Sequence, residues 1–124
     1  MGESIMLERA KDFAVAIVET CRSIKAEQRE SVLTNQLLRS GTSIGANIHE
    51  SKYAHGTADF IAKMQIALKE CYESEYWLEL LYQTNYLSEA QYAPLRSDCG
   101  AIRRMLITSI NTVKNNKHER NIEI

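Results

Sequence analysis

Apolar residues recur along most of this chain at steps of three and four, the spacing that gathers them on one face of a helix. Short polar stretches interrupt the pattern, which predicts helices at residues 4–26, 31–53, 58–84 and 89–114. The polar residues 115–124 are expected to form a frayed tail. There is no alternating strand pattern and no sequence repeat. Four amphipathic helices with short connections indicate an all-α, up-down-up-down antiparallel bundle formed by residues 1–114.

Each predicted helix carries one apolar face that is expected to form the core of the bundle. From the first helix to the last, these inward positions are Ala10, Phe13, Ala14, Ile17, Cys21 and Ile24; Leu33, Leu37, Ile44 and Ile48; Phe60, Met64, Ala67, Cys71, Ser74, Leu78 and Leu81; and Leu95, Cys99, Ile102, Leu106, Ile110 and Val113.

Local signals mark where the predicted helices begin and end. Gly56 suits the end of the second helix, and Thr57 is expected to cap the third. Asn85 is a suitable stop for the third helix. Residues 88–91 match the capping box S-x-x-Q and are expected to open the fourth helix. Because Pro94 lies too deep for a first-turn proline, we expect either a kink or a helix that starts later, near residue 92.

Two glycines lie four residues apart inside the second predicted helix. Gly41 and Gly45 belong to a run of small residues within an otherwise helical pattern. A glycine in a helix interior costs about 1 kcal/mol relative to alanine. Such a pair therefore suggests that something approaches the backbone closely, and a packed partner helix is the simplest candidate.

Composition narrows the class of protein. The 124 residues suffice for one domain, with an ordinary hydrophobic content of 44% and charged content of 25%. The net charge of −1 argues mildly against a dedicated nucleic-acid binder, which usually carries a basic excess. The sequence shows no signal-peptide hydrophobic region and no apolar run long enough to span a membrane, so we expect a cytoplasmic protein without a membrane partner.

The residue patterns of common catalytic and metal sites are missing from the sequence. The segment 41–46 lacks the Gly-Lys-Ser/Thr ending of a phosphate-binding loop, and no glutamate has a histidine three residues later. His49 and His55 make no convincing pair of ligands. The three cysteines are far apart and fall on apolar helix faces, where they act as small hydrophobes. We therefore expect no enzyme activity, no cofactor and no metal.

The third predicted helix has more apolar residues than one face requires. The excess lies roughly opposite the core-facing side, and exposed apolar patches often mark interfaces. We expect this apolar stripe to pack against a neighbouring subunit; the alternative is that the connection after the first helix or the C-terminal tail covers it. The apolar stripe comprises Ile66, Tyr76, Trp77 and Leu80.

A polar line runs along the second predicted helix beside acidic residues of the third. Arginine can hold a carboxylate with two hydrogen bonds, so Arg39 with Glu70 or Glu73 would fix the register between helices or subunits. The alternatives are a solvated surface, on which ion pairs contribute little, and a ligand site. The residues of this predicted network are Gln36, Arg39, Ser43, Asn47, Glu50, Glu70 and Glu73.

Basic residues concentrate toward the C-terminal end of the chain. Arg96, Arg103 and Lys114 form one stripe on the fourth predicted helix. Such a stripe can contact nucleic-acid phosphates, which would make binding depend on salt. The alternatives are a solvated face, or pairing with an acidic helix across an interface.

Two segments carry a resemblance to a known family. Residues Gln36–Ser51 (QLLRSGTSIGANIHES) and Ala58–Leu81 (ADFIAKMQIALKECYESEYWLELL) resemble the bacterial four helix bundle protein family. Its members include the proteins encoded by intervening sequences within 23S rRNA genes, sometimes labelled ribosomal proteins. A more distant relative is the accessory protein of diversity-generating retroelements, which is strongly basic and binds nucleic acid and its reverse transcriptase. The resemblance implies a left-handed bundle assembled as a homopentamer, with no known enzyme activity.

These observations lead to three hypotheses about function. The first is a homo-oligomeric scaffold or adaptor, pentameric by the resemblance, whose candidate partners are further copies of itself and an unidentified protein. The second is an accessory protein that binds RNA, DNA or a nucleic-acid enzyme through the basic stripe. The third is a small-molecule or metal binder that uses the polar line. The sequence favours the first.

Overall fold

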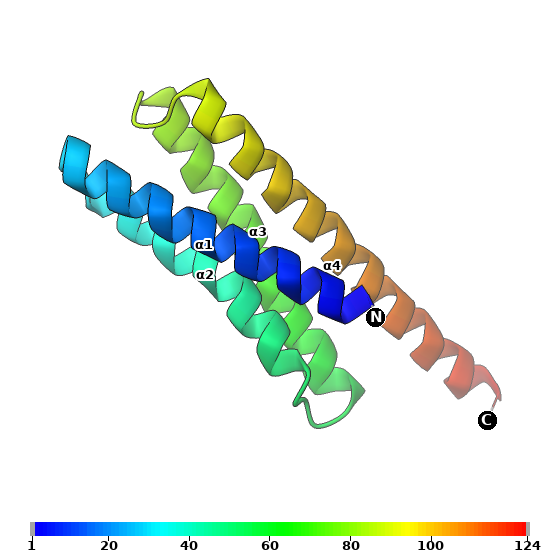
Figure 1. Cartoon of the computed structure of the whole chain (residues 1–124). Coiled ribbons are helices and arrows are strands. Elements are labelled where there is room, and N and C mark those ends of the chain that lie inside the picture. The colour runs from blue at the N-terminus through cyan, green and yellow to red at the C-terminus, as the bar shows by residue number, and fades with distance from the viewer. Residues whose placement is uncertain (1, 124) are drawn as a thin grey trace.

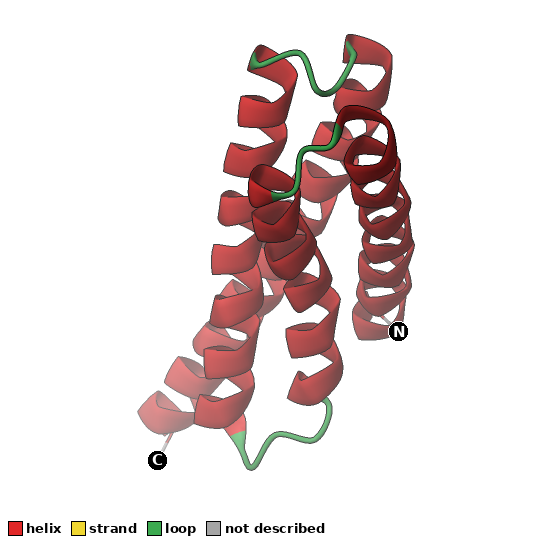
Figure 2. Cartoon of the chain, turned by 90° about the vertical axis from the view of Figure 1, so that its left-hand side faces the viewer, coloured by secondary structure: helices red, strands yellow, loops and turns green. Residues whose placement is uncertain are grey.

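The computed structural model describes the backbone of residues 2–123 and the side chains of residues 5–116. This part of the chain folds into the helices α1 (Gly2–Gln28), α2 (Val32–Ser51), α3 (Thr57–Gln83) and α4 (Glu89–Glu123), without a strand. Successive helices run in opposite directions and are joined at alternate ends by short connections (Figures 1 and 2). Each helix packs on its neighbours in sequence, and α4 also packs on α1. The all-α four-helix bundle predicted from the sequence is therefore confirmed.

The core contains most of the residues whose spacing placed them inward. The side chains of Phe13, Ile17, Leu37 and Leu106 are almost completely buried, together with the rest of the predicted faces. Four predicted core residues are only partly buried, namely Ala14, Leu33, Phe60 and Val113. The core also contains Met6 and Leu7, which the sequence analysis left out. Within residues 2–123, no helix combines the length and apolarity that a bilayer crossing requires.

The fourth helix is longer than the sequence suggested. The polar segment 115–124 was expected to form a frayed tail, but α4 continues to Glu123. The sequence after Gly100 contains no glycine and no proline, so nothing in it breaks the helix. Its polar composition fits its position, because the last turns of α4 continue beyond the N-terminal end of α1 (Figure 1).

A glutamate outside the helix caps α2. The Leu33 N–H donates to Glu30 Oε1 at 2.7 Å, and the Thr34 N–H donates to Glu30 Oε2 at 2.9 Å. Ser31 occupies the N-cap position but forms no side-chain cap bond. Burial alone would raise the pKa of the Glu30 carboxyl, but these hydrogen bonds outweigh it and hold that pKa below its ordinary value.

The capping box predicted at the start of the fourth helix is present. The Gln91 N–H donates to Ser88 Oγ at 3.2 Å, and the Ser88 N–H donates to Gln91 Oε1 at 2.9 Å. Because α4 begins at Glu89, Pro94 lies inside the helix and the later start near residue 92 is not observed. Asn85 follows α3 in the left-handed region, with φ 68°, as suits a helix stop.

The connection between α2 and α3 differs in detail from the prediction. The second helix ends at Ser51, and Gly56 occupies the N-cap position of α3 with φ 94°. Thr57 is therefore the first residue of α3 rather than its cap. A positive φ costs glycine little, which explains its place at this turn.

Candidate functional site

The two glycines of α2 face α1. A Cβ atom added at Gly41 would lie 3.0 Å from Ile17 Cγ2, closer than side chains normally pack. One added at Gly45 would lie 3.5 Å from Ala10 Cβ, an ordinary contact. The close partner suggested by the sequence is thus α1 of the same chain. Of the two glycines, Gly41 is the one whose neighbours leave too little room for a side chain.

A small polar cluster joins α2 to α3 inside the bundle. Ser74 Oγ donates to Ser40 Oγ at 2.9 Å, and Ser40 Oγ donates to the Leu37 carbonyl at 3.3 Å. Both serine side chains are fully buried. Buried hydroxyls need partners, so this pair favours one alignment of α2 against α3. The sequence analysis placed Ser74 inward but did not foresee its partner.

An ion-pair cluster lies on the outer surface between α2 and α3. Arg39 forms ion pairs with Glu70, at 3.1 Å, and with Glu73. The hydrogen bond to Glu73, and then the charge of Glu70, raise the pKa of Arg39 above its ordinary value. One guanidinium faces two carboxylates, so the cluster carries a net charge of −1. We call Arg39, Glu70 and Glu73 the acidic face.

The remaining residues of the predicted polar line do not join this cluster. Ser43 Oγ donates to the Arg39 carbonyl at 2.6 Å, and Asn47 Nδ2 donates to the Ser43 carbonyl at 2.8 Å, so both bind the backbone of their own helix. Glu50 Oε1 lies 3.9 Å from Lys63 Nζ. The side chain of Gln36 is exposed. The structure therefore brings together the arginine and two glutamates but does not form a continuous ligand site.

A second cluster, of opposite charge, lies between α3 and α4. Glu75 is 8% exposed, and its carboxylate is 2.8 Å from Arg96 Nη1 and 2.8 Å from Arg103 Nε. The hydrogen bond to Glu75 raises the pKa of Arg103, and its guanidinium also lies 5.7 Å from the centre of the Tyr72 ring. Two guanidiniums share one carboxylate, which leaves a net charge of +1. We call Glu75, Arg96 and Arg103 the basic face.

The basic face changes the interpretation of the stripe on the fourth helix. Arg96 and Arg103 were candidates for nucleic-acid contact, but each pairs with Glu75 of the same chain. Lys114 is exposed and does not belong to this cluster. Sequence analysis missed Glu75 as a site residue, because a glutamate on a helix is usually solvated. The residue pattern did not show that Glu75 lies on the side of α3 that faces α4.

The apolar stripe of α3 is covered in part. Ile66 is 44% exposed and Tyr76 is 59% exposed, whereas Trp77 and Leu80 are partly buried. Trp77 packs against the core, and its Nε1–H is buried without an acceptor among the described residues. The Tyr76 and Trp77 rings meet edge to face, with centroids 5.0 Å apart. Neither the connection after α1 nor the described part of α4 removes Ile66 and Tyr76 from water.

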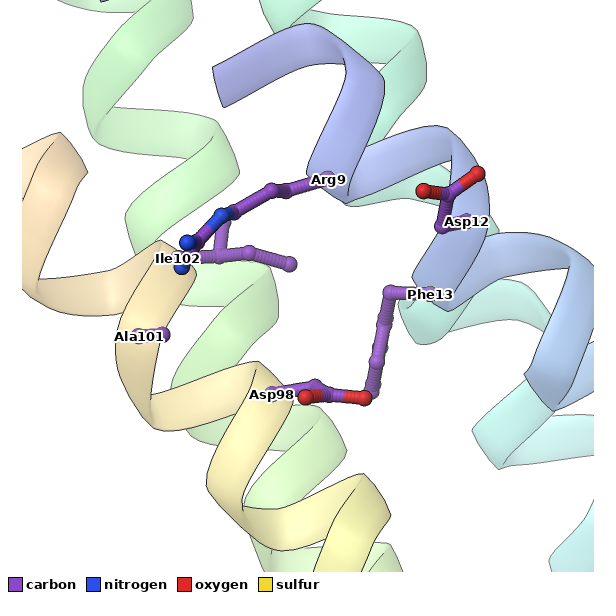
Figure 3. A pocket seen from close by; sticks show the side chains of 6 residues that line it. All are labelled: Arg9, Asp12, Phe13, Asp98, Ala101 and Ile102. Atoms are coloured by element: carbon purple, nitrogen blue, oxygen red, sulfur yellow. The ribbon is translucent and has the colours of Figure 1, made fainter. Parts of the chain in front are cut away.

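A groove of about 270 Å³ lies between α1 and α4. Figure 3 shows Arg9 extending from α1 toward Ile102, and Asp98 of α4 lying beside the ring of Phe13. The rest of its lining consists of Asp12 and Ala101. Sequence analysis did not predict this groove, because its residues come from opposite ends of the chain.

The described residues contain no arrangement that indicates catalysis. The three cysteines are free and buried, and burial raises the pKa of Cys21 to about 11. A hydrogen bond with Cys99 and burial raise the pKa of Cys71 even further. A thiol that stays protonated is a poor nucleophile. No group of three or more histidine, cysteine, aspartate or glutamate side chains in this part of the chain is placed to hold a metal ion.

Comparisons with known proteins agree on one family. The model of the 23S rRNA-intervening sequence protein family matches residues 2–108. A solved structure from Bacteroides thetaiotaomicron, described as a protein with unknown function from the S23 ribosomal protein family, is 46% identical in sequence and superimposes with a TM-score of 0.88. The match covers 90% of this chain and 99% of that one. None of the curated proteins matches the chain.

Proposed function

Because this chain belongs to the 23S rRNA-intervening sequence protein family, we propose that it is a non-enzymatic helical scaffold or adaptor built from several copies of itself. The solved relative has no stated activity, so the family does not supply a reaction. A pentamer is the assembly that the family resemblance implies.

The observation that carries this proposal is the exposed part of the apolar stripe. Ile66 is 44% exposed and Tyr76 is 59% exposed, although the core-facing side chains of the same helix are buried. A large apolar side chain left in water forgoes roughly 1.5–3 kcal/mol of burial. A second copy packed against α3 would recover that free energy for Ile66 and Tyr76 and would complete the cover over Trp77 and Leu80.

The ion pairs of the basic face count against a nucleic-acid accessory role. Arg96 and Arg103 share the carboxylate of Glu75, so the cluster offers nucleic-acid phosphates a net charge of +1 rather than two free guanidiniums. One such charge adds little to binding that depends on many phosphate contacts.

Light scattering coupled to size-exclusion chromatography tests the proposal. We expect a mass near five times 14.1 kDa that persists on dilution. Ile66→Asp should lower that mass, because a desolvated carboxylate opposes burial of the stripe. Ile66 suits this test better than Trp77, since Trp77→Asp would also disturb the core on which the indole packs.

The matched control is Val15→Asp, an equally apolar and exposed position on α1, outside the stripe. It should leave the mass unchanged. A wild-type mass of 14.1 kDa at all concentrations would contradict self-assembly. An Ile66→Asp variant that stays fully assembled would contradict the role of the stripe.

A further inference from the structure

The two charge clusters of this molecule are opposite in sign and share one helix. The acidic face sets one guanidinium against two carboxylates, and the basic face sets two guanidiniums against one carboxylate. Neither cluster neutralises itself, and the excess charges remain in contact with water. The side chain of Glu73 is 32% exposed and that of Arg96 is 37% exposed.

A third arginine strengthens the basic side. A Cβ atom at Gly100 would lie 3.3 Å from Arg104 Nη1 and 3.5 Å from Arg103 Nη2, so both guanidiniums fold over this glycine. Arg104 is exposed, and no carboxylate among the described side chains pairs with it. The outer surface of α4 therefore presents more positive charge than Glu75 can balance.

Each cluster lies beside apolar side chains that are exposed or partly buried. Along α3 the acidic face is bracketed by Ile66 and Trp77, one turn before Glu70 and one turn after Glu73. The basic face is flanked by Tyr72, which is 51% exposed and whose ring centre lies 5.7 Å from the Arg103 guanidinium. Apolar and aromatic side chains next to charged groups are what a protein interface combines in its core and rim.

From this charge complementarity we propose that copies of the chain join head to tail, with the acidic face of one copy against the basic face of the next. The proposal rests on the self-assembly proposed above and names the two surfaces that meet. The two surfaces differ, so the contact is heterologous, and such contacts build either closed rings or open filaments.

The shared helix fits the closed ring that a pentamer, the assembly implied by the family resemblance, requires. Both faces include α3, so they lie on adjacent sides of the bundle rather than on opposite sides. Two contacts on adjacent sides turn the chain of copies back toward itself and allow a ring to close, whereas contacts on opposite sides would continue in a line. The opposite charges would also reject a copy that presents the same face, because like charges brought together across an interface repel each other.

A charge exchange tests the pairing. Glu73→Arg should reverse the acidic face, and Arg104→Glu should weaken the basic face without removing either arginine that binds Glu75. We expect each single variant to raise the concentration at which half of the assembly dissociates by about tenfold or more. The double variant, Glu73→Arg with Arg104→Glu, sets a charge of +1 against a side that is neutral once residue 104 is counted, so the like-charge repulsion of Glu73→Arg alone is removed. It should therefore assemble at lower concentration than Glu73→Arg in light scattering.

The controls make the same kinds of charge reversal at positions outside both faces. Glu8→Arg and Arg22→Glu lie at exposed positions on α1 and should leave assembly unchanged. Circular dichroism melting of each variant shows whether the bundle is intact. Should Glu73→Arg unfold, because it places two arginines side by side, Glu73→Gln replaces it, and loss of assembly in Glu73→Gln and in Arg104→Glu then supports the pairing.

The outcomes separate this inference from the proposed function. A monomeric wild-type protein overturns self-assembly itself, before any variant is made. An assembled wild-type protein whose folded single variants keep their mass overturns the pairing and leaves self-assembly standing. Folded single variants that dissociate, with a double variant that assembles no better than Glu73→Arg alone, show that the two faces do not meet each other and also overturn the pairing.

Discussion

At the scale of residues, Gly41 and Gly45 look equivalent in sequence but not in the structure. A methyl group at Gly41 would press on Ile17, and one at Gly45 would make an ordinary contact with Ala10. The spacing of the glycines predicted a close neighbour, but it did not show which glycine needed the room. That distinction depends on the shape of the facing side chain, which no periodicity reveals.

These distances predict opposite effects for two identical substitutions. Gly45→Ala should leave the free energy of unfolding unchanged or raise it by up to about 1 kcal/mol, because alanine favours the helix. Gly41→Ala should lower it by about 1–2 kcal/mol, since overpacking against Ile17 outweighs the same helical gain. Urea unfolding followed by circular dichroism at one fixed protein concentration measures the free energy of unfolding of both variants. Equal effects of the two substitutions would contradict this account.

The ion pairs show what residue patterns can and cannot reveal. The link from Arg39 to Glu70 and Glu73 could be suggested because α2 and α3 are neighbours in sequence and the polar residues recur on one side. Glu75 was missed although α3 and α4 are also neighbours. Its two arginines were interpreted as a surface stripe, because a pattern on one helix does not show which side of the next helix it will face.

At the scale of elements, the end of a helix depends on local hydrogen bonds more than on residue type at one position. Ser88 and Gln91 form the capping box that their spacing predicted, since both partners lie within one turn. Ser31 stands where a cap is expected, yet the bonds at the start of α2 come from Glu30. The extent of α4 was underestimated because polarity was taken as a sign of fraying, and polarity alone does not break a helix.

The cap on α2 gives a prediction with a close control. Glu30→Ala should lower the free energy of unfolding by about 0.5–2 kcal/mol, because the N–H groups of Leu33 and Thr34 lose their acceptor. Ser31→Ala, one residue later, should have little effect, since the Ser31 side chain makes no cap bond. Thermal melts of both variants near neutral pH compare the two, and a larger loss for Ser31→Ala would refute the assignment.

The same cap predicts how its contribution depends on pH. The folded protein holds the pKa of Glu30 below its ordinary value of 4.5, so folding favours the charged form. The stabilisation is therefore complete above that value and is lost as the pH falls through the lower, folded-state pKa. The difference in stability between wild type and Glu30→Ala should shrink on acidification below about pH 4.5. A difference that stays constant across this range would exclude the charged cap.

At the scale of the whole molecule, the bundle follows from the sequence and the assembly does not. Helical periodicity, short connections and the chain breakers near residues 56 and 85 were enough to predict the antiparallel arrangement. An exposed apolar stripe indicates that another group covers this part of the surface, but it does not identify that group. The faces that could meet became visible only when the fold placed Glu75 between two arginines and Arg39 between two glutamates.

Which helices pack against each other also affects how fast the chain folds. Three of the four packed pairs join helices that follow each other directly, and only the contact of α1 with α4 spans the whole bundle. Proteins dominated by such local contacts fold in microseconds to milliseconds, because little loop-closure entropy is lost before contacts form. In stopped-flow refolding, the helical signal should return within milliseconds, and association should follow as a slower phase that depends on concentration. Each newly made monomer would then be a finished bundle before it meets its first neighbour.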